Sequence, residues 1–169
     1  MSALRLVFLL LLIVVAFTAV GAQTKTLSHS QAVRTMQKCM ERAFDVCNED
    51  TVDRVIKRYY RGDRRLLAYL FDARKIADGA LGEELSAFYG DLMVSRPLPF
   101  VTAVSKLPRK EQDQLLFLTS ADGLSPRGRK RAISNLRRIG KSYPLFSHIV
   151  NRCLDAIGDG RTRPNLGNK

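Results

Sequence analysis

Apolar residues recur every three or four positions through most of the chain between residues 30 and 158, in short blocks separated by turn residues. This spacing places apolar side chains on one face of a helix, whereas a half-buried strand requires alternation at every second residue. No stretch of the sequence shows sustained alternation bounded by hairpin turns. The sequence therefore predicts an all-α fold, a single domain of seven or eight short amphipathic helices.

The expected helices begin and end at recognisable signals. Gly79 stands where a glycine would terminate one of them in a left-handed conformation. Ser125 and Pro126 mark the clearest start, because serine caps a helix N-terminus and proline suits the first turn. Four successive apolar residues, 115–118, predict that the helix after Pro108 is central. The other expected ranges are 31–47, 51–61, 64–78, 82–95, 99–106, 125–141 and 144–157.

The first 22 residues have the features of a secretory signal peptide. Arg5 precedes an apolar run at residues 6–17, and small residues end the stretch. This order predicts cleavage before Gln23 and a secreted protein. The alternative is an uncleaved membrane anchor, because residues 4–22 approach the minimum length of a transmembrane helix. The polar residues that follow favour cleavage.

The chain that remains after cleavage has the size of one ordinary domain. We expect a leader at residues 23–29, the all-α domain at residues 30–158 and a disordered basic tail at residues 159–169. Charge is uneven along this chain. Residues 23–122 carry 16 basic and 14 acidic side chains, whereas residues 123–169 carry 11 basic and 2 acidic ones. Such a cationic C-terminal third favours an anionic partner.

The expected helix from Ser125 to Lys141 is the most specific feature of the sequence. A helical wheel places six cations on one arc, with no acid among them, and the apolar residues on the other side. This arc predicts binding to lipid headgroups, sulfated glycans or other anionic groups, and the alternative is a solvated outer face. Aromatic residues do not alternate with these cations, so specific nucleic-acid binding is not favoured. The candidate anion-binding residues are Arg127, Lys130, Arg131, Arg137, Arg138 and Lys141.

Three cysteines in a secreted chain leave one thiol over when two of them form a disulfide. If residues 31–47 form one helix, Cys39 and Cys47 lie about 12 Å apart, too far for a bond. Cys47 and Cys153 each lie centrally in an apolar stripe. We therefore expect a Cys47–Cys153 disulfide with Cys39 as a free or intermolecular thiol. The alternative is three buried free cysteines.

The helical body contains many aromatic and leucine residues, which suggests a second function. Short amphipathic helices around a shared interior can leave a cavity, so the protein is alternatively a carrier of an apolar small molecule such as a fatty acid. A packed core without a cavity is the other interpretation. The candidate ligand contacts are Tyr59, Phe71, Phe88, Tyr89 and Phe100.

Several segments resemble the insect allergen-related repeat. They are VDRVIKRYY at residues 52–60, LAYL at 67–70, VSKLP at 104–108, LLFL at 115–118, DGL at 122–124 and ISNLRRI at 133–139. The resemblance implies a secreted, helical gut protein with an interior that holds lipid. We transfer no individual site residue from the family.

Motifs of catalysis and metal binding are absent from the sequence. It contains no HExxH, GxSxG, CxxC or glycine-rich phosphate loop, and its two histidines, His29 and His148, are far apart. We therefore expect a non-catalytic binding protein without cofactor or metal. A hydrolase with two carboxylates brought together by the fold is one alternative. Dibasic pairs such as Arg137-Arg138 make a peptide-hormone precursor another.

Overall fold

The structure is a computed structural model that describes residues 27–41, 47–121 and 124–158. The expected signal peptide, most of the leader and the expected basic tail lie outside the described residues. The described part contains eight α-helices and three short 3-10 helices, and no strand. The prediction of an all-α fold is confirmed.

The expected helices agree with the observed ones in number and approximate position. The expected helix at 64–78 is divided into three short pieces, and the last expected helix begins with a 3-10 turn. The α-helices are α2 (His29–Glu41), α4 (Glu49–Tyr60), α5 (Leu67–Asp72), α6 (Gly79–Ser95), α7 (Pro97–Ser105), α8 (Arg109–Ala121), α9 (Pro126–Ser142) and α10 (Ser147–Ala156). The 3-10 helices are η1 (Arg64–Leu66), η2 (Ala73–Ile76) and η3 (Pro144–Phe146).

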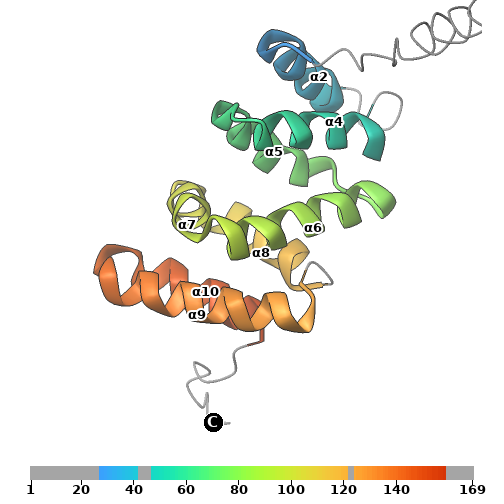
Figure 1. Ribbon diagram of the computed structural model, residues 1–169. Helices are drawn as coiled ribbons and strands as arrows, with labels where there is room; N and C mark the ends of the chain where they lie inside the picture. Colours follow the sequence, from blue (N-terminus) through green and yellow to red (C-terminus); the bar gives the residue numbers. More distant parts are fainter. Residues whose placement is uncertain (1–26, 42–46, 122–123, 159–169) are drawn as a thin grey trace, which may run out of the picture.

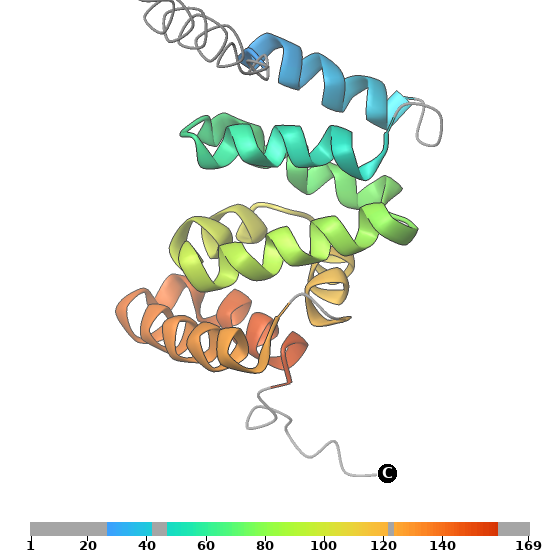
Figure 2. The same ribbon diagram turned by 45° about the vertical axis from the view of Figure 1, so that its right-hand side comes forward.

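The helices are stacked in layers that follow the order of the chain (Figures 1 and 2). Helix α2 forms one end of the stack and packs on α4, α5 and η2. The middle layers contain α4 with α5, and then α6 with α7 and α8. Helices α9 and α10 pack against each other at the opposite end and contact α6, α7 and α8. Helix α9 therefore has one side on the stack and another side at the surface of the molecule.

Helix α6 has the central place in the stack, because it contacts α4, α7, α8 and α9. Its apolar residues are buried on several sides, among them Leu85, Phe88 and Leu92. Tyr89 is fully buried, and its hydroxyl donates a hydrogen bond to the Leu70 carbonyl at 2.7 Å. The one polar atom of this side chain is thus satisfied inside the core.

Helix α8 is less central than its run of four apolar residues predicts. Leu115 and Leu116 are buried and Leu118 is half-buried, but the side chain of Phe117 is 73% exposed. Helix α8 contacts α6 and α10 and has a side that faces solvent. An apolar run around a helix therefore does not by itself show that the whole helix is enclosed.

Gly79 begins α6 instead of ending the preceding helix. The preceding 3-10 helix ends at Ile76, and Asp78 is the N-cap residue of α6. Gly79 has φ of +45°, which lies in the left-handed region that suits a residue without a Cβ atom. The predicted left-handed conformation of Gly79 is confirmed. The prediction that Gly79 ends a helix is wrong, because it is the first residue of α6.

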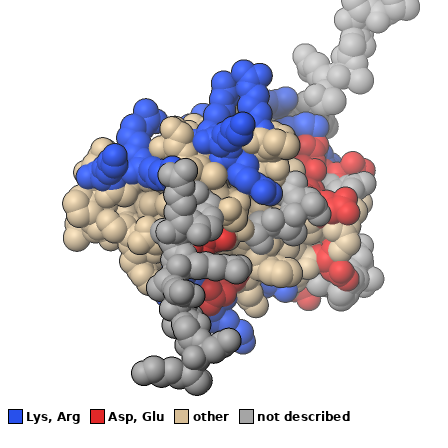
Figure 3. All heavy atoms as spheres, turned by 90° about the horizontal axis from the view of Figure 1, so that it is seen from below, with Lys and Arg blue, Asp and Glu red and all other residues tan. Residues whose placement is uncertain are grey.

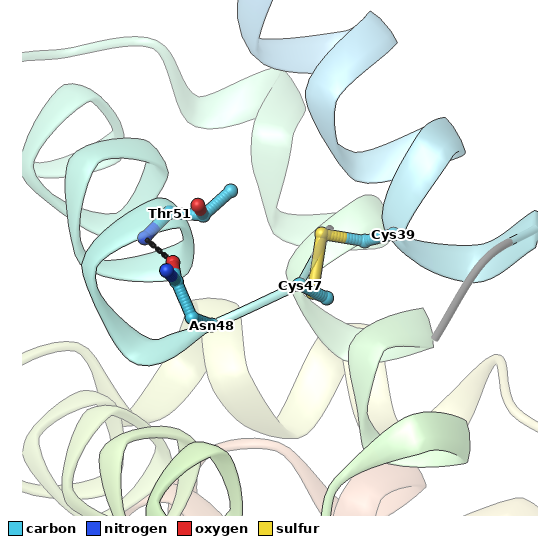
Figure 4. The surroundings of a disulfide bond; sticks show 4 residues. All are labelled: Cys39, Cys47, Asn48 and Thr51. Atoms are coloured by element: carbon cyan, nitrogen blue, oxygen red, sulfur yellow. Dashed lines mark hydrogen bonds between the residues drawn. A yellow bond between two sulfur atoms is a disulfide. The ribbon is translucent and has the colours of Figure 1, made fainter. Parts of the chain in front are cut away.

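The cysteine pairing differs from the expected one. Cys39 and Cys47 form a disulfide with their Cα atoms 4.7 Å apart (Figure 4), and Cys153 is a buried free cysteine. The expected Cys47–Cys153 bond is wrong, because Cys47 is bonded to Cys39. The 4.7 Å separation of their Cα atoms also shows that Cys39 and Cys47 do not share one continuous helix, in which they would lie about 12 Å apart.

The residue after Cys47 starts the next helix. The Asn48 side chain accepts a hydrogen bond from the Thr51 backbone N–H at 2.9 Å and so caps α4 (Figure 4). A disulfide is consistent with an oxidising compartment, as expected of a secreted protein. Within the described ranges, no helix has the length and apolar character needed to cross a membrane.

Candidate functional site

The predicted cationic helix is α9, and its start is confirmed. The Ser125 hydroxyl accepts a hydrogen bond from the Gly128 backbone N–H at 3.1 Å, and Pro126 occupies the first turn. The apolar residues Ala132, Leu136 and Ile139 are buried on the side of α9 that faces the stack. This packing leaves the opposite side of α9 at the surface.

Most of the predicted anion-binding residues lie at the surface of this end of the molecule. Arg137 is half-buried, and the other five are exposed. Figure 3 views the molecule from the end at which α9 lies and shows Lys and Arg side chains gathered along one side of this face. The acidic side chains of this view lie mostly to the right of and below the main group of cations, and some of them border cations at the upper right. The cations therefore form a surface with a predominantly positive potential.

Three of the six cations lie along the junction of α9 with α6. Arg127 and Arg131 line a hollow of about 290 Å³ together with Asp91 and Val94 of α6. Arg138 lines a second hollow, of about 500 Å³, at the other end of α9. These three positions are separated by four and seven residues, so they share one side of the helix.

The second hollow is lined by two arginines from different helices, Arg138 of α9 and Arg96. Arg96 is the C-cap residue of α6 and was not among the predicted site residues. Asn135 positions Arg138, because the Asn135 Oδ1 accepts a hydrogen bond from Arg138 at 3.1 Å. Asn135 is itself held by a 2.9 Å hydrogen bond that its Nδ2 donates to the Val94 carbonyl. Arginine side chains are well suited to binding phosphate, sulfate or carboxylate.

Apolar side chains stand in solvent next to these cations. Tyr143 lines the same hollow as Arg138 and is 46% exposed. Leu145, two residues later in η3, is 97% exposed. Neither residue is among the predicted site residues. Leu145 belongs to the apolar pattern of the expected helix at 144–157, and such a pattern predicts a buried side chain. A cationic surface bordered by an exposed tyrosine and leucine is typical of proteins that bind at the membrane interface.

The five aromatic residues proposed for an apolar ligand lie in the packed core. None is more than 3% exposed. Their rings pack edge to face, with centroid distances of 5.5 Å for Tyr59 and Phe88, 5.5 Å for Phe71 and Tyr89, and 5.9 Å for Phe71 and Phe100. The aromatic side chains therefore pack against each other. Phe71 in addition forms part of the floor of a surface groove between α5 and α7.

The two histidines and the free cysteine lie in different parts of the molecule and do not form a common site. His29 is 2.8 Å from the Asp63 carboxylate at one end of the stack, and His148 of α10 is 3.1 Å from Arg109. Cys153 is buried, and burial raises the pKa of its thiol to about 12. The positive charge of Arg152 opposes this rise only in part. In the part of the chain that the structure describes, no three His, Cys, Asp or Glu side chains could together hold a metal ion.

No protein-family model, curated protein or solved structure matches this chain. The resemblance to the insect allergen-related repeat therefore stays a prediction. We infer the function from the geometry of α9 and its surroundings.

Proposed function

We propose that this protein is secreted after cleavage of a signal peptide at residues 1–22 and docks on anionic lipid surfaces without catalysing a reaction. The docking surface is the cationic side of α9 with the exposed Tyr143 and Leu145 beside it. The observation that carries this proposal is the presence of both features at one end of the stack. The disulfide between Cys39 and Cys47 supports secretion, because disulfides persist in oxidising compartments.

Charge supplies the first part of the attraction. A lysine or arginine near an anionic membrane contributes about 1 kcal/mol, and this contribution falls off within a Debye length. Six cations on one helix therefore supply enough free energy to hold the protein at a membrane that contains acidic lipids. The buried side of α9 anchors the helix to the stack, so the cations are presented without unfolding of the domain.

The exposed apolar side chains favour a lipid surface over a sulfated glycan. A glycan offers anionic groups but no apolar phase, so it gains nothing from a leucine that is 97% exposed. At a membrane the Leu145 side chain can enter the acyl boundary, and each buried CH₂ group gains about 0.8 kcal/mol. The Tyr143 ring suits the headgroup level, where one end is apolar and the other is wet.

Co-sedimentation with vesicles tests the proposal. The test variant carries glutamine at the six predicted anion-binding residues of α9 and retains Arg129. The control variant carries glutamine at six exposed cations outside α9 and therefore has the same net charge. Its substituted residues are Arg34, Lys38, Arg54, Lys57, Arg61 and Lys110, all exposed.

We expect the wild type to bind vesicles of phosphatidylcholine and phosphatidylserine and to remain unbound to pure phosphatidylcholine. The affinity of the α9 variant for these vesicles should fall more than about tenfold. The affinity of the control variant should fall much less, because only cations close to the membrane surface contribute strongly to binding. Equal losses in the two variants would show that net charge alone causes binding. If the protein bound heparin more strongly than acidic vesicles, and a Leu145→Ser substitution left this binding unchanged, the result would contradict a lipid surface and indicate a sulfated glycan as the partner. Circular dichroism checks that each variant is folded.

A further inference from the structure

A groove of about 580 Å³ lies on the surface between α5 and α7, which belong to neighbouring layers of the stack (Figure 1). One wall comes from η1 and α5, and the other wall comes from α7 and the two residues that follow it. The volume is within the range of about 300 to 1,000 Å³ that is typical of small-molecule sites.

The walls and floor of the groove are mainly apolar. Phe71 is buried in the core and forms part of the floor, while Leu67, Leu98 and Leu107 are half-buried and pack against the core. Such a surface is already fixed by the packing of the core and needs no rearrangement to accept an apolar chain. The apolar lining consists of Leu67, Ala68, Phe71, Leu98, Pro99, Ala103 and Leu107.

Three cations and one acid lie around the apolar lining. The acid is Asp72, whose carboxylate is 2.8 Å from the Lys75 ammonium group and 3.6 Å from the Arg74 guanidinium. The charge of Asp72 is therefore already compensated by its neighbours. The cations Arg64, Arg65 and Lys106 leave the edge of the groove with an excess of positive charge.

These three cations differ in how they are held. The Arg64 guanidinium donates to the Tyr59 carbonyl at 2.9 Å and stacks on the Tyr59 ring at 4.7 Å from its centroid. Arg65 is 75% exposed and lies 3.5 Å from Asp63, a carboxylate that Arg58 already binds. For Lys106 no ion pair is found among the described residues. Arg65 and Lys106 are therefore the cations most accessible to an added anion.

We infer that this groove binds a single-chain anionic amphiphile, with its acyl chain on the apolar floor and its carboxylate or phosphate bound by Arg65 and Lys106. A neutral acyl chain would make no ion pair with Arg65 and Lys106, and a small anion would leave the apolar floor of the groove exposed to water. The inference goes beyond docking on a surface, since it concerns one molecule bound per chain. Leu98 and Pro99 line both this groove and the hollow that contains Arg96 and Arg138. The groove thus adjoins the surface that we propose to face the lipid.

Isothermal titration calorimetry without vesicles, below the critical micelle concentration, tests the inference. The probes are laurate and lauroyl-lysophosphatidate, which present the same chain with a carboxylate or a phosphate. Dodecanol presents the chain without charge, and acetate presents the charge without the chain. We expect one anionic amphiphile to bind per chain, with dodecanol and acetate at least about tenfold weaker. The tighter of the two anionic probes identifies the headgroup.

Two variants place the binding in the groove. Ala68→Trp fills the groove at an exposed position and should lower the affinity for laurate more than about tenfold, whereas Ala80→Trp, at an exposed position outside the groove, should leave it unchanged. The double variant R65Q/K106Q should bind laurate no better than dodecanol. The variant with six neutralised cations on α9 should retain the affinity for laurate, so a failure of surface docking leaves this inference standing.

The inference is overturned if laurate and lysophosphatidate give no binding to the wild type, or if Ala68→Trp binds them as tightly as the wild type does. It is also overturned if laurate and dodecanol bind with equal affinity, because the cations would then contribute nothing. A thermal melt of Ala68→Trp confirms that a loss of binding comes from the filled groove.

Discussion

Arg74 of η2 and Glu111 of α8 form an ion pair in which the arginine side chain is fully buried. The Arg74 guanidinium also donates to the Phe71 carbonyl and lies 3.6 Å from Asp72. These contacts link the part of the stack that contains α5 to the layer that contains α8. A charge buried in this way is tolerated only while its partners are present.

Replacement of Glu111 by alanine should therefore destabilise the fold strongly. It leaves the buried Arg74 with Asp72 as its remaining carboxylate, and breaking a buried pair costs about 3 kcal/mol. Asp53→Ala is the matched control, since it removes the exposed pair of Asp53 with Lys57, worth less than about 1 kcal/mol. Urea unfolding measures both losses. Equal losses would show that the pair with Arg74 contributes no more than a surface contact.

Asp63 makes the stability of the protein sensitive to acid. Burial opposes ionisation of its carboxyl, but hydrogen bonds from His29 and Arg58 outweigh burial and hold its pKa below the ordinary value of 3.8. A lowered pKa in the folded state stabilises the fold fully above the ordinary pKa, and this contribution disappears as the pH falls through the folded-state value.

Asp63→Asn should consequently melt at a lower temperature than the wild type near neutral pH. The difference in melting temperature should shrink below about pH 4, because the wild type then loses the same contribution. Thermal melts followed by circular dichroism at neutral and acidic pH measure this difference. A difference that stays constant between the two conditions would contradict the assigned role of the Asp63 carboxylate.

Removal of the Cys39–Cys47 disulfide should cost about 2.5 kcal/mol in the chain-entropy model, because the loop between the cysteines is short. The expected Cys47–Cys153 bond would have closed a loop of about 100 residues, worth about 4.7 kcal/mol. Denaturant unfolding of the double variant C39S/C47S measures the cost. Thiol titration of the wild type provides the control. We expect no reactive thiol in the native protein, because Cys153 is buried, and one reactive thiol per chain after unfolding without reductant. Three thiols after unfolding would show that no disulfide forms.

The cationic side of α9 could be predicted because all its residues belong to one helix. The start of that helix follows from Ser125 and Pro126, and 3.6 residues per turn then determine which side chains share a side. The disulfide could not be predicted in the same way. The apolar pattern that begins near Val33 continues past Glu41, and no glycine or proline marks the end of α2 at that residue.

The hollow with Arg96 and the groove between α5 and α7 depend on contacts between different elements. Arg96 and Arg138 are 42 positions apart in the sequence and line one hollow because α6 packs on α9. Leu67 and Ala103 line one groove because successive layers stack. The spacing within a helix carries no information about such pairings. The five aromatic residues show the same limit: their apolar character placed them in the interior, but it could not distinguish a filled interior from a cavity.

Fluorescence of a single tryptophan at position 145 tests the proposed docking most directly. The chain contains no tryptophan, so Leu145→Trp reports on this position alone. Phe117→Trp, at a side chain of α8 that is 73% exposed, is the matched control. With phosphatidylserine-containing vesicles we expect a blue shift for Leu145→Trp and none for Phe117→Trp, and no shift for either with pure phosphatidylcholine. An unchanged spectrum of Leu145→Trp on vesicles that bind the protein, or a shift at position 117 alone, would contradict docking through α9.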